Sequence, residues 1–283
     1  MTPGDHDEMQ RFLDEDYGRG DITSDLLVPR ELEARGEIKM KEEAVIAGID
    51  EVSTLLNRMG LEQKWNFNDG STIRFGDVLV TVSGNARNML AVERITLNIL
   101  GHMSGIATAT RRAVDIVNRI NSAVRVAGTR KTIPGLRLME KRAIKLGGGD
   151  PHRSDLHDMI LIKDNHLSLM GTISSSIRRI RESMPDEGGR IEVEVDTSEG
   201  ASEAARSGAD IIMLDNMSVE DVREAVIHLE KEGLRGKVAL EVSGGIRFDN
   251  LEAYAKAGID IISMGILTNS SHAMDMSFKI RRA

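Results

Sequence analysis

Short apolar runs alternate with helical segments along the second half of the chain. Each run is rich in Val, Ile or Leu and ends abruptly in polar residues or glycine. There are six of them, at Val124–Ala127, Met159–Ile162, Ile191–Val195, Ile211–Leu214, Val238–Val242 and Ile259–Met264. Segments such as Ser218–Glu232 and Asp249–Ala257 have helical periodicity, and Gly258 stands where a helix C-cap is expected. This alternation is typical of βαβ units and predicts a parallel sheet.

The ends of these runs indicate which parallel fold to expect. All six end in polar or glycine residues, and the carboxyl ends of parallel strands meet at one edge of the sheet. The pattern therefore predicts an α/β fold with an incomplete (β/α) barrel of six strands. An open, doubly wound sheet is the alternative.

The first hundred residues lack this rhythm. Glu37–Gly48 and Val78–Gly84 have strand character, and a helix is expected near Asp50–Gly60. Glu93–Ile120 is a long helical run, with an expected break near Gly101 and Gly105 because glycine weakens a helix interior. The pattern predicts a separate α+β domain joined to the barrel by this run.

Composition narrows the class of protein. The 283 residues are 40% hydrophobic and contain no cysteine, which excludes disulfides and thiolate catalysis. A net charge of −8 argues against a general nucleic-acid-binding surface. No apolar run approaches the roughly 18 residues of a membrane span, and the acidic N-terminus lacks the layout of a signal peptide. A cytoplasmic protein is expected.

One stretch, residues 129–153, is basic in an acidic chain. It holds seven Lys/Arg residues against two acids, whereas the whole chain has 37 bases and 45 acids. Arg137, Lys141 and Lys145 share one helix face, for which solvent exposure is the favoured interpretation. The loops at either end carry four further cationic groups, Arg130, Lys131, His152 and Arg153. Because arginine binds carboxylates and phosphates bidentately, these loops predict a site for a small ligand with several anionic groups.

Three further strand ends carry candidate chemistry. Lys163 follows the apolar run 159–162, where an unpaired ammonium would be costly, so it is expected to face an anion; a Schiff-base role is the alternative. Glu194 and Asp215 place carboxylates at neighbouring strand ends, which suit Mg²⁺ or ribose hydroxyls. Glu192, Glu194 and Asp196 alternate on one side of their strand, so spacing alone does not decide which of them faces the site.

The last two strands end in glycine. Ser243-Gly244-Gly245 and Met264-Gly265 stand where barrels often bind a phosphate through backbone N–H groups. An anion cradle, two carboxylates and a phosphate site together describe a phosphosugar beside an anionic co-substrate. The residues alone do not identify the reaction.

Several longer motifs, however, resemble a known family. TRKTIPGLR, GGGDPHRSDLHDMILIKDNH, IEVEVDT, IIMLDN and EVSGGI follow one another as in the quinolinate phosphoribosyltransferases. The likeness extends upstream through ERITLNILGHMSGIAT to EDYGRGDITSDLL, so it spans nearly the whole chain. One departure is Arg142, where the family pattern has an aromatic residue on a scaffold helix.

The resemblance implies a fold and a reaction. The expected fold is an N-terminal α/β sandwich domain, residues 1–105, followed by the incomplete barrel, residues 106–268, with 269–283 packing back on the sandwich. The expected reaction joins quinolinate to phosphoribosyl pyrophosphate (PRPP) with Mg²⁺. It gives nicotinate mononucleotide, pyrophosphate and CO₂ in NAD biosynthesis. Homodimers or larger homo-oligomers are expected, with the sandwich of one subunit over the barrel of another.

The resemblance also implies a role for individual residues. The set expected to bind quinolinate is Arg94 (from the neighbouring subunit), Thr129, Arg130, His152, Arg153 and Lys163. The set expected to bind PRPP is Lys131, Glu194, Asp215, Ser243, Gly244, Gly245, Met264, Gly265 and Ile266. Four of these residues are expected to act in catalysis, namely Lys131, Lys163, Glu194 and Asp215. Glu194 and Asp215 are also expected to hold Mg²⁺, directly or indirectly.

Three alternatives remain at this stage. A paralogue found with molybdate-uptake genes shares the TRKT and HR motifs but uses another substrate. A different phosphosugar barrel enzyme, such as an isomerase or lyase, would have no need of the cationic cradle. A non-catalytic phosphate-binding regulator would leave the Glu194 and Asp215 pair unexplained.

Overall fold

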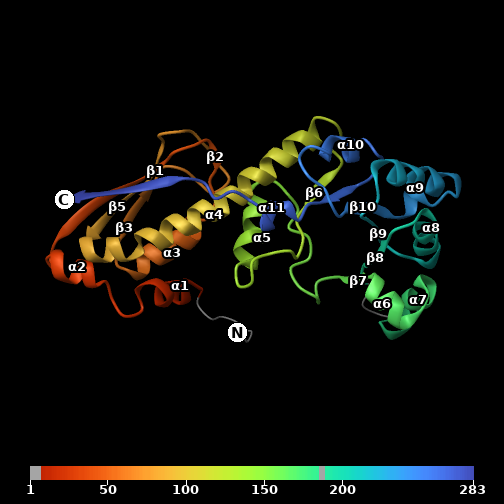
Figure 1. Ribbon diagram of the computed structural model, residues 1–283, viewed down its shortest axis with the longest axis horizontal. Helices are drawn as coiled ribbons and strands as arrows, with labels where there is room; N and C mark the ends of the chain where they lie inside the picture. The colour runs from red at the N-terminus through yellow and green to blue at the C-terminus, as the bar shows by residue number, and fades with distance from the viewer. Residues whose placement is uncertain (1–7, 185–188) are drawn as a thin grey trace. The chain divides into compact units, whose positions relative to one another are not determined.

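The computed structural model describes residues 8–184 and 189–283. It divides into two compact units: residues up to Ala109 with Ser271–Ala283, and Thr110–Ser270 (Figure 1). The boundary falls within α4, Ala86–Asn118. Among the described residues, no helix is long and apolar enough to cross a membrane.

The first unit is built on an antiparallel sheet in the order β12-β1-β5-β3. These strands are β1 (Glu33–Met40), β3 (Glu62–Trp65), β5 (Val78–Asn85) and β12 (Met276–Arg282). Side chains of β1 alternate in burial, so one face of the sheet contributes to the core. Gly36 of β1 touches Met89 of α4, and Figure 1 shows α3 (Ile49–Arg58) and α4 along one face of the sheet.

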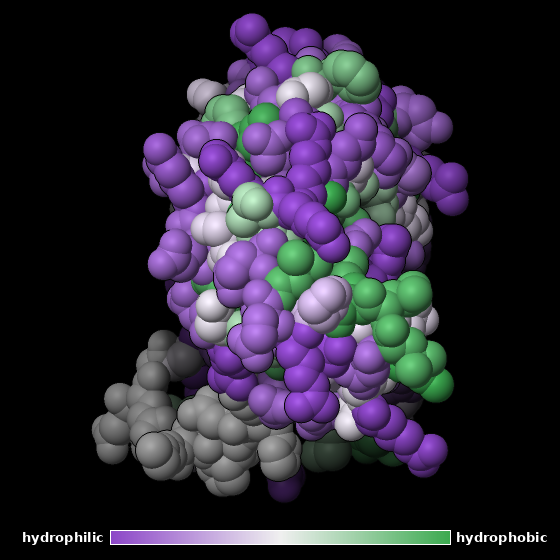
Figure 2. Space-filling model, turned by 90° about the vertical axis from the view of Figure 1, so that its left-hand side faces the viewer, coloured by the Kyte–Doolittle hydropathy of each residue, from purple (hydrophilic) through white to green (hydrophobic). Residues whose placement is uncertain are grey.

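The remaining elements of the first unit are short. They are α1 (Glu8–Tyr17), α2 (Ile22–Leu27) and a small pair of strands, β2 (Ala44–Val45) and β4 (Thr72–Ile73). Figure 2 shows a largely hydrophilic face of this unit, with one larger group of apolar side chains and some smaller ones. The large apolar side chains that α2 exposes are Ile22, Leu26 and Leu27, each at least three quarters exposed.

Helix α4 is continuous over 33 residues, so the expected break near its glycines is wrong. The glycines serve packing instead. A Cβ on Gly105 would lie 2.0 Å from the backbone oxygen of His272, and one on Gly101 would lie 2.9 Å from that of Met274. The C-terminal segment therefore contacts α4 where α4 has no side chain. Tertiary packing outweighs the weak helix propensity of glycine here.

The second unit holds six parallel strands in the order β6-β11-β10-β9-β8-β7. They are β6 (Arg125–Ala127), β7 (Ile160–Ile162), β8 (Ile191–Val195), β9 (Ile211–Asp215), β10 (Ala239–Ser243) and β11 (Ile261–Ser263). Strands β6 and β7 form the two edges. The predicted fold class, an α/β sandwich followed by an incomplete barrel, is confirmed.

Helices follow the strands in turn. They are α5 (Arg137–Leu146), α6 (Asp164–Met170), α7 (Ile173–Ser183), α8 (Ser198–Ser207), α9 (Val219–Lys231), the 3₁₀ turn η1 (Arg235–Lys237), α10 (Leu251–Ala255) and α11 (Ile266–Asn269). Thr172, Thr197 and Ser218 cap α7, α8 and α9 through their hydroxyls. Figure 1 shows α8 and α9 along the outside of β8, β9 and β10. Since the strands are parallel, their C-terminal ends share one edge, where the loops can meet.

The contact at Gly105 yields a test of the first unit. Gly105→Ala should destabilise this unit by about 1–3 kcal/mol, because the methyl group would overlap the backbone of His272. The urea midpoint, followed by circular dichroism, measures this effect. Gly236→Ala is the control, because a Cβ there meets no atom within 4 Å. Equal midpoints for the two variants would contradict the proposed packing.

Candidate active site

Two loops of the barrel unit bring three of the predicted anion-binding residues together. Arg130 follows β6, and His152 and Arg153 follow the glycine-rich turn after α5. Burial and then the charge of Arg130 lower the pKa of Arg153, so the two guanidinium groups lie within electrostatic reach of each other. Arg130 is half-buried, and its Nε has no hydrogen-bond partner among the described residues. Two close like charges favour an anion between them.

His152 is held by backbone and ring together. Its φ is 56°, a left-handed conformation, and its N–H donates to Oδ1 of Asp150 at 2.8 Å. The same carboxylate accepts from Arg125 at 2.8 Å, which ties the loop to β6. The ring Nε2 lies 3.0 Å from Oε2 of Glu241, inside the barrel. The side chain is thus fixed before any ligand arrives.

The barrel interior holds two fully buried carboxyl groups, on Glu192 of β8 and Glu241 of β10. Burial, and then the neighbouring charge of Glu241, raise the pKa of Glu192 to about 8. The periodicity of β8 did not decide which acidic residue faces the site. In the structure Glu192 lies beneath His152, at 3.9 Å from Nε2, whereas Glu194 lies nearer the mouth.

Lys141 is not on a solvated face, so that part of the sequence interpretation is wrong. Only 4% of the residue is exposed, and its ammonium donates to the backbone oxygen of Pro151, next to His152. Burial, and then the charge of Arg137, lower the pKa of Lys141 to about 8. Arg137 itself donates to Thr132 and to the backbone of Ser154, so it links the two cationic loops.

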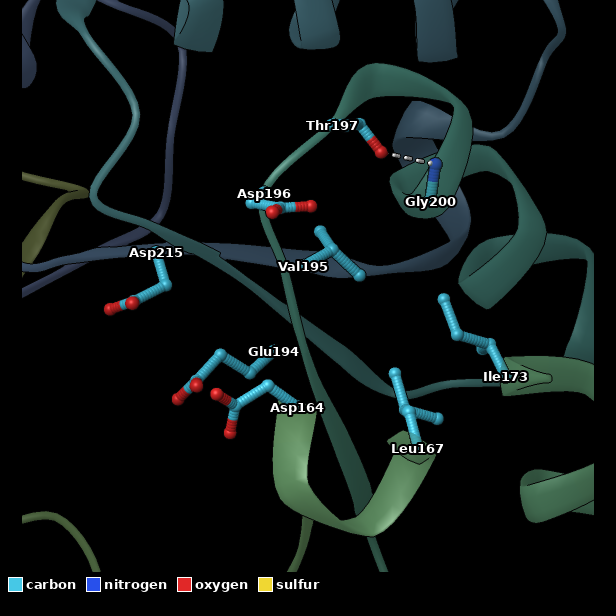
Figure 3. Close-up of a pocket in the computed structure, with 9 residues that line it drawn as sticks. All are labelled: Asp164, Leu167, Ile173, Glu194, Val195, Asp196, Thr197, Gly200 and Asp215. Carbon is cyan, nitrogen blue, oxygen red and sulfur yellow. Dashed lines mark hydrogen bonds between the residues drawn. The ribbon is translucent and has the colours of Figure 1, made fainter. Parts of the chain in front are cut away.

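The predicted carboxylates line a second part of the edge. Glu194 and Asp215 border a cavity of about 230 Å³ together with Asp164, Leu167, Ile173, Val195, Asp196, Thr197 and Gly200. In Figure 3 the carboxylates of Asp164, Glu194 and Asp215 point toward the same side of this cavity, while Leu167 and Ile173 lie on the other. Lys163 forms an ion pair with Glu194. The oxygen donors fit a hard cation such as Mg²⁺.

The predicted phosphate residues surround a third space. Lys131, the Ser243–Gly245 loop, Gly265 and Ile266 line one cavity of about 210 Å³, together with Thr129, which was predicted to bind quinolinate. Gly244 has φ +89°, and a Cβ there would lie 2.3 Å from the side-chain oxygen of Asn216, so only glycine fits. Lys131 packs close to Gly265, whose hypothetical Cβ would be 3.1 Å from its Cδ.

Two predicted residues are not among these groups. Arg94 is exposed on α4 and belongs to the first unit, whereas the other predicted quinolinate residues belong to the barrel unit. Met264 is fully buried, and its N–H donates to the backbone oxygen of Ala127, so that N–H is not offered to a phosphate.

Some residues at the site were missed in the sequence. Arg247, Asn269 and Ser270 line the phosphate-sized cavity, and Glu241 holds His152. Glu241 had a detectable signal, because a carboxylate in the middle of the apolar run Val238–Val242 must find a partner when buried. Arg247, Asn269 and Ser270 follow turns, and the sequence does not show the direction that those turns take.

The edge of the barrel thus defines a class of protein: an enzyme that holds a polyanionic sugar phosphate beside a second anionic substrate. Both parts of the chain match one family. Residues 21–104 match the N-terminal domain of quinolinate phosphoribosyl transferase, and residues 106–279 match its C-terminal domain. The chain belongs to the quinolinate phosphoribosyltransferase family.

Individual relatives agree along the whole length. The probable nicotinate-nucleotide pyrophosphorylase (carboxylating) of Methanothermobacter thermautotrophicus is 41% identical over 276 residues, covering 97% of this chain and 98% of that protein. The corresponding protein of Mycobacterium leprae is 36% identical, covering 97% and 96%. The crystal structure of nicotinate-nucleotide pyrophosphorylase from Ehrlichia chaffeensis superimposes with a TM-score of 0.91 at 33% identity, covering 99% and 100%.

The environment of Lys141 predicts a pH effect on stability. Because its pKa is lowered to about 8 in the folded chain, the unfolded chain binds more protons between pH 8 and 10.5. Stability of the wild type relative to Lys141→Met should therefore rise across that window, by up to about 1.4 kcal/mol per pH unit. Urea unfolding at pH 7.5, 8.5 and 9.5 measures this difference.

The exposed Lys145 of the same helix provides the control. The stability difference between wild type and Lys145→Met should stay constant over the same pH values. If the Lys141→Met difference were equally constant, the ammonium of Lys141 would not be buried in solution.

Proposed function

We propose that this chain transfers the phosphoribosyl group of PRPP to quinolinate with decarboxylation, giving nicotinate mononucleotide, pyrophosphate and CO₂ in de novo NAD biosynthesis. The observation that carries the proposal is that the guanidinium groups of Arg130 and Arg153 lie within electrostatic reach of each other, and that of Arg153 within reach of the buried carboxyl of Glu192. Two guanidinium groups and a histidine at one place suit a rigid dianion such as quinolinate. The neighbouring glycine-lined cavity suits the 5′-phosphate of the sugar.

The cationic groups would orient quinolinate as follows. Arg130, Arg153, His152 and Lys163 would bind the two carboxylates, with Thr129 beside them. Lys163 is already paired with Glu194, the carboxylate proposed for the ribose, so it would stand between the quinolinate and the ribose. The pyridine nitrogen would thereby be directed toward the anomeric carbon of PRPP.

The bond changes need no side-chain nucleophile. The C1–O bond to pyrophosphate breaks with its electron pair on pyrophosphate, and the pyridine nitrogen forms the new bond to C1. Glu194 and Asp215 would stabilise the positive charge that develops on the ribose, and Lys131 the departing pyrophosphate. The bond between the ring and the adjacent carboxylate then breaks, and CO₂ leaves. The electron pair of that bond stays on the ring carbon, where the pyridinium stabilises it, and a proton from solvent then takes the place of the lost carboxylate.

Magnesium is the proposed cofactor. The carboxylates of Glu194 and Asp215, in a cavity that Asp164 also borders, would hold the ion directly or through water. When bound, Mg²⁺ supplies positive charge to pyrophosphate and lowers the cost of its departure.

We further propose a homodimer or larger homo-oligomer in which Arg94 completes the quinolinate site of a neighbouring subunit. Arg94 is exposed on α4 and is free to face another copy. The exposed apolar side chains of α2 support an interface on the same unit. The chain would act in the cytoplasm, which cell fractionation would test; its lack of cysteine is consistent with that compartment.

The activity itself has a direct test. Purified chain, quinolinate, PRPP and Mg²⁺ should yield nicotinate mononucleotide and CO₂ in equal amounts, followed by chromatography and trapped ¹⁴CO₂. Product should vanish when either substrate is omitted and fall when EDTA removes the metal. Asp215→Asn should require more Mg²⁺ for half-maximal rate. A folded chain that binds PRPP but makes no product would point to the paralogue that uses another substrate.

A complementation experiment tests the shared site. Arg94→Ala and Lys163→Ala chains should each be inactive, because each lacks a cation needed for quinolinate. Mixed dimers would carry one site with both changes and one intact site. A random equal mixture should therefore regain about a quarter of the wild-type rate, since half of the dimers are mixed and half of their sites intact. Absence of recovery in verified mixed dimers would rule out the proposed sharing.

A further inference from the structure

A cluster inside the barrel lies directly beneath the proposed quinolinate position. His152 Nε2 is 3.0 Å from Oε2 of Glu241 and 3.9 Å from Oε2 of Glu192. Both glutamates are fully buried, and the His152 side chain is 10% exposed. Within the described part of the chain, neither oxygen of Glu192 nor Oε1 of Glu241 has a hydrogen-bond partner. The ring is therefore the one group that satisfies Glu241.

This hydrogen bond decides what the ring can offer a ligand. Because Nε2 is engaged by a carboxylate, Nδ1 is the ring nitrogen left to meet a substrate. A neutral ring that donates from Nε2 carries a lone pair on Nδ1, which would repel a substrate carboxylate. A doubly protonated ring donates from both nitrogens. With Glu241 ionised and accepting from Nε2, a hydrogen bond from Nδ1 to an anion thus requires the imidazolium form.

The charges around His152 favour that form. Burial lowers the pKa of His152, but the hydrogen bond and charge of Glu241 from β10, with the charge of Glu192 from β8, outweigh it. Lys141 from α5 opposes them. The net effect raises the pKa of His152 above its ordinary value.

We propose that Glu241 is a positioning residue for substrate binding: by holding Nε2 of His152 it orients the ring and keeps it doubly protonated, so that Nδ1–H donates to a carboxylate of the substrate. The inference rests on the proposed function for the identity of that substrate. Glu241 does not touch the substrate and acts through His152 alone. Glu192 lies in the same interior without holding the ring.

The same three residues could be taken for a metal site, since their ligand atoms lie within 4.8 Å of one another. The surroundings argue against it. The charges of Arg153 and Lys163 reach Glu192, and Lys141 acts on His152, so the carboxyl groups already face several cations. A further cation would be repelled by them.

The test measures quinolinate affinity by calorimetry on the full chain. Glu241→Gln should weaken quinolinate binding about ten- to a hundredfold, because a charge-assisted contact at Nδ1 is lost. Its affinity for PRPP should stay within about twofold of the wild type. Glu192→Gln removes a carboxyl from the same interior but leaves the ring hydrogen bond, so its effect should be clearly smaller. In a His152→Ala background, Glu241→Gln should have no further effect.

A second measurement uses the wild type alone, so it remains decisive if Glu241→Gln fails to fold. The ¹⁵N shifts of the His152 ring should show both nitrogens protonated at pH 7. A neutral ring at that pH would overturn the inference. So would additive effects of Glu241→Gln and His152→Ala, equal effects of Glu192→Gln and Glu241→Gln, or a bound metal ion that is lost on His152→Ala.

Failure of the proposed function would look different. In that case the wild type itself would bind no quinolinate. The ring would still report its protonation state in the ¹⁵N spectrum.

Discussion

Repulsion between positive charges that must be held close together is the constraint on which this site depends. Arg130 and Arg153 lie within electrostatic reach of each other on separate loops, and the buried Lys141 lies within reach of both. Such a group is costly in a folded chain unless opposite charge lies within reach. The barrel supplies that charge from inside, through Glu241 in contact with His152, so the cations remain available at the surface for a ligand. The negative charge that stabilises the cations is therefore buried inside the barrel, away from the surface that binds the ligand.

The same principle connects the separate parts of the edge. Lys163 pairs with Glu194, which borders the carboxylate-lined cavity, while Lys131 packs against Gly265 of the glycine-lined cavity. Each lysine therefore contacts a residue that lines one of the two cavities. A ligand that draws Lys163 away from Glu194 would free that carboxylate for the sugar. The binding of one substrate and the readiness of the site for the other would then be coupled through a single ion pair.

Sequence patterns predicted the second unit well because its strands are short, apolar and sharply terminated. All six runs became strands, and their ends placed Arg130, Lys163 and Asp215 at one edge. Lys141 was misjudged because helical spacing shows which residues share a face, not whether a loop covers that face. The helix break predicted at Gly101 and Gly105 was wrong because the segment that packs on these glycines is more than 160 residues away in sequence. Local helix propensity does not report such distant contacts. The tertiary contact between Glu241 and His152 could not be predicted either, because the two residues are far apart in sequence. The sequence does show that Glu241 stands in an apolar strand and must find a partner there.

The pairing of β12 with β1 has a consequence for the order of folding. Ala34 pairs with Arg282, and Lys41 bonds Asp275, so two neighbouring strands of the first unit's sheet are separated in sequence by the whole second unit. During synthesis the strand β1 emerges early but cannot gain this neighbour until the entire barrel has been made. The barrel can mature first, whereas the first unit must wait with an unpaired edge. Such an edge is open to non-native pairing, so the nascent chain stays exposed to mispairing until β12 has been synthesised.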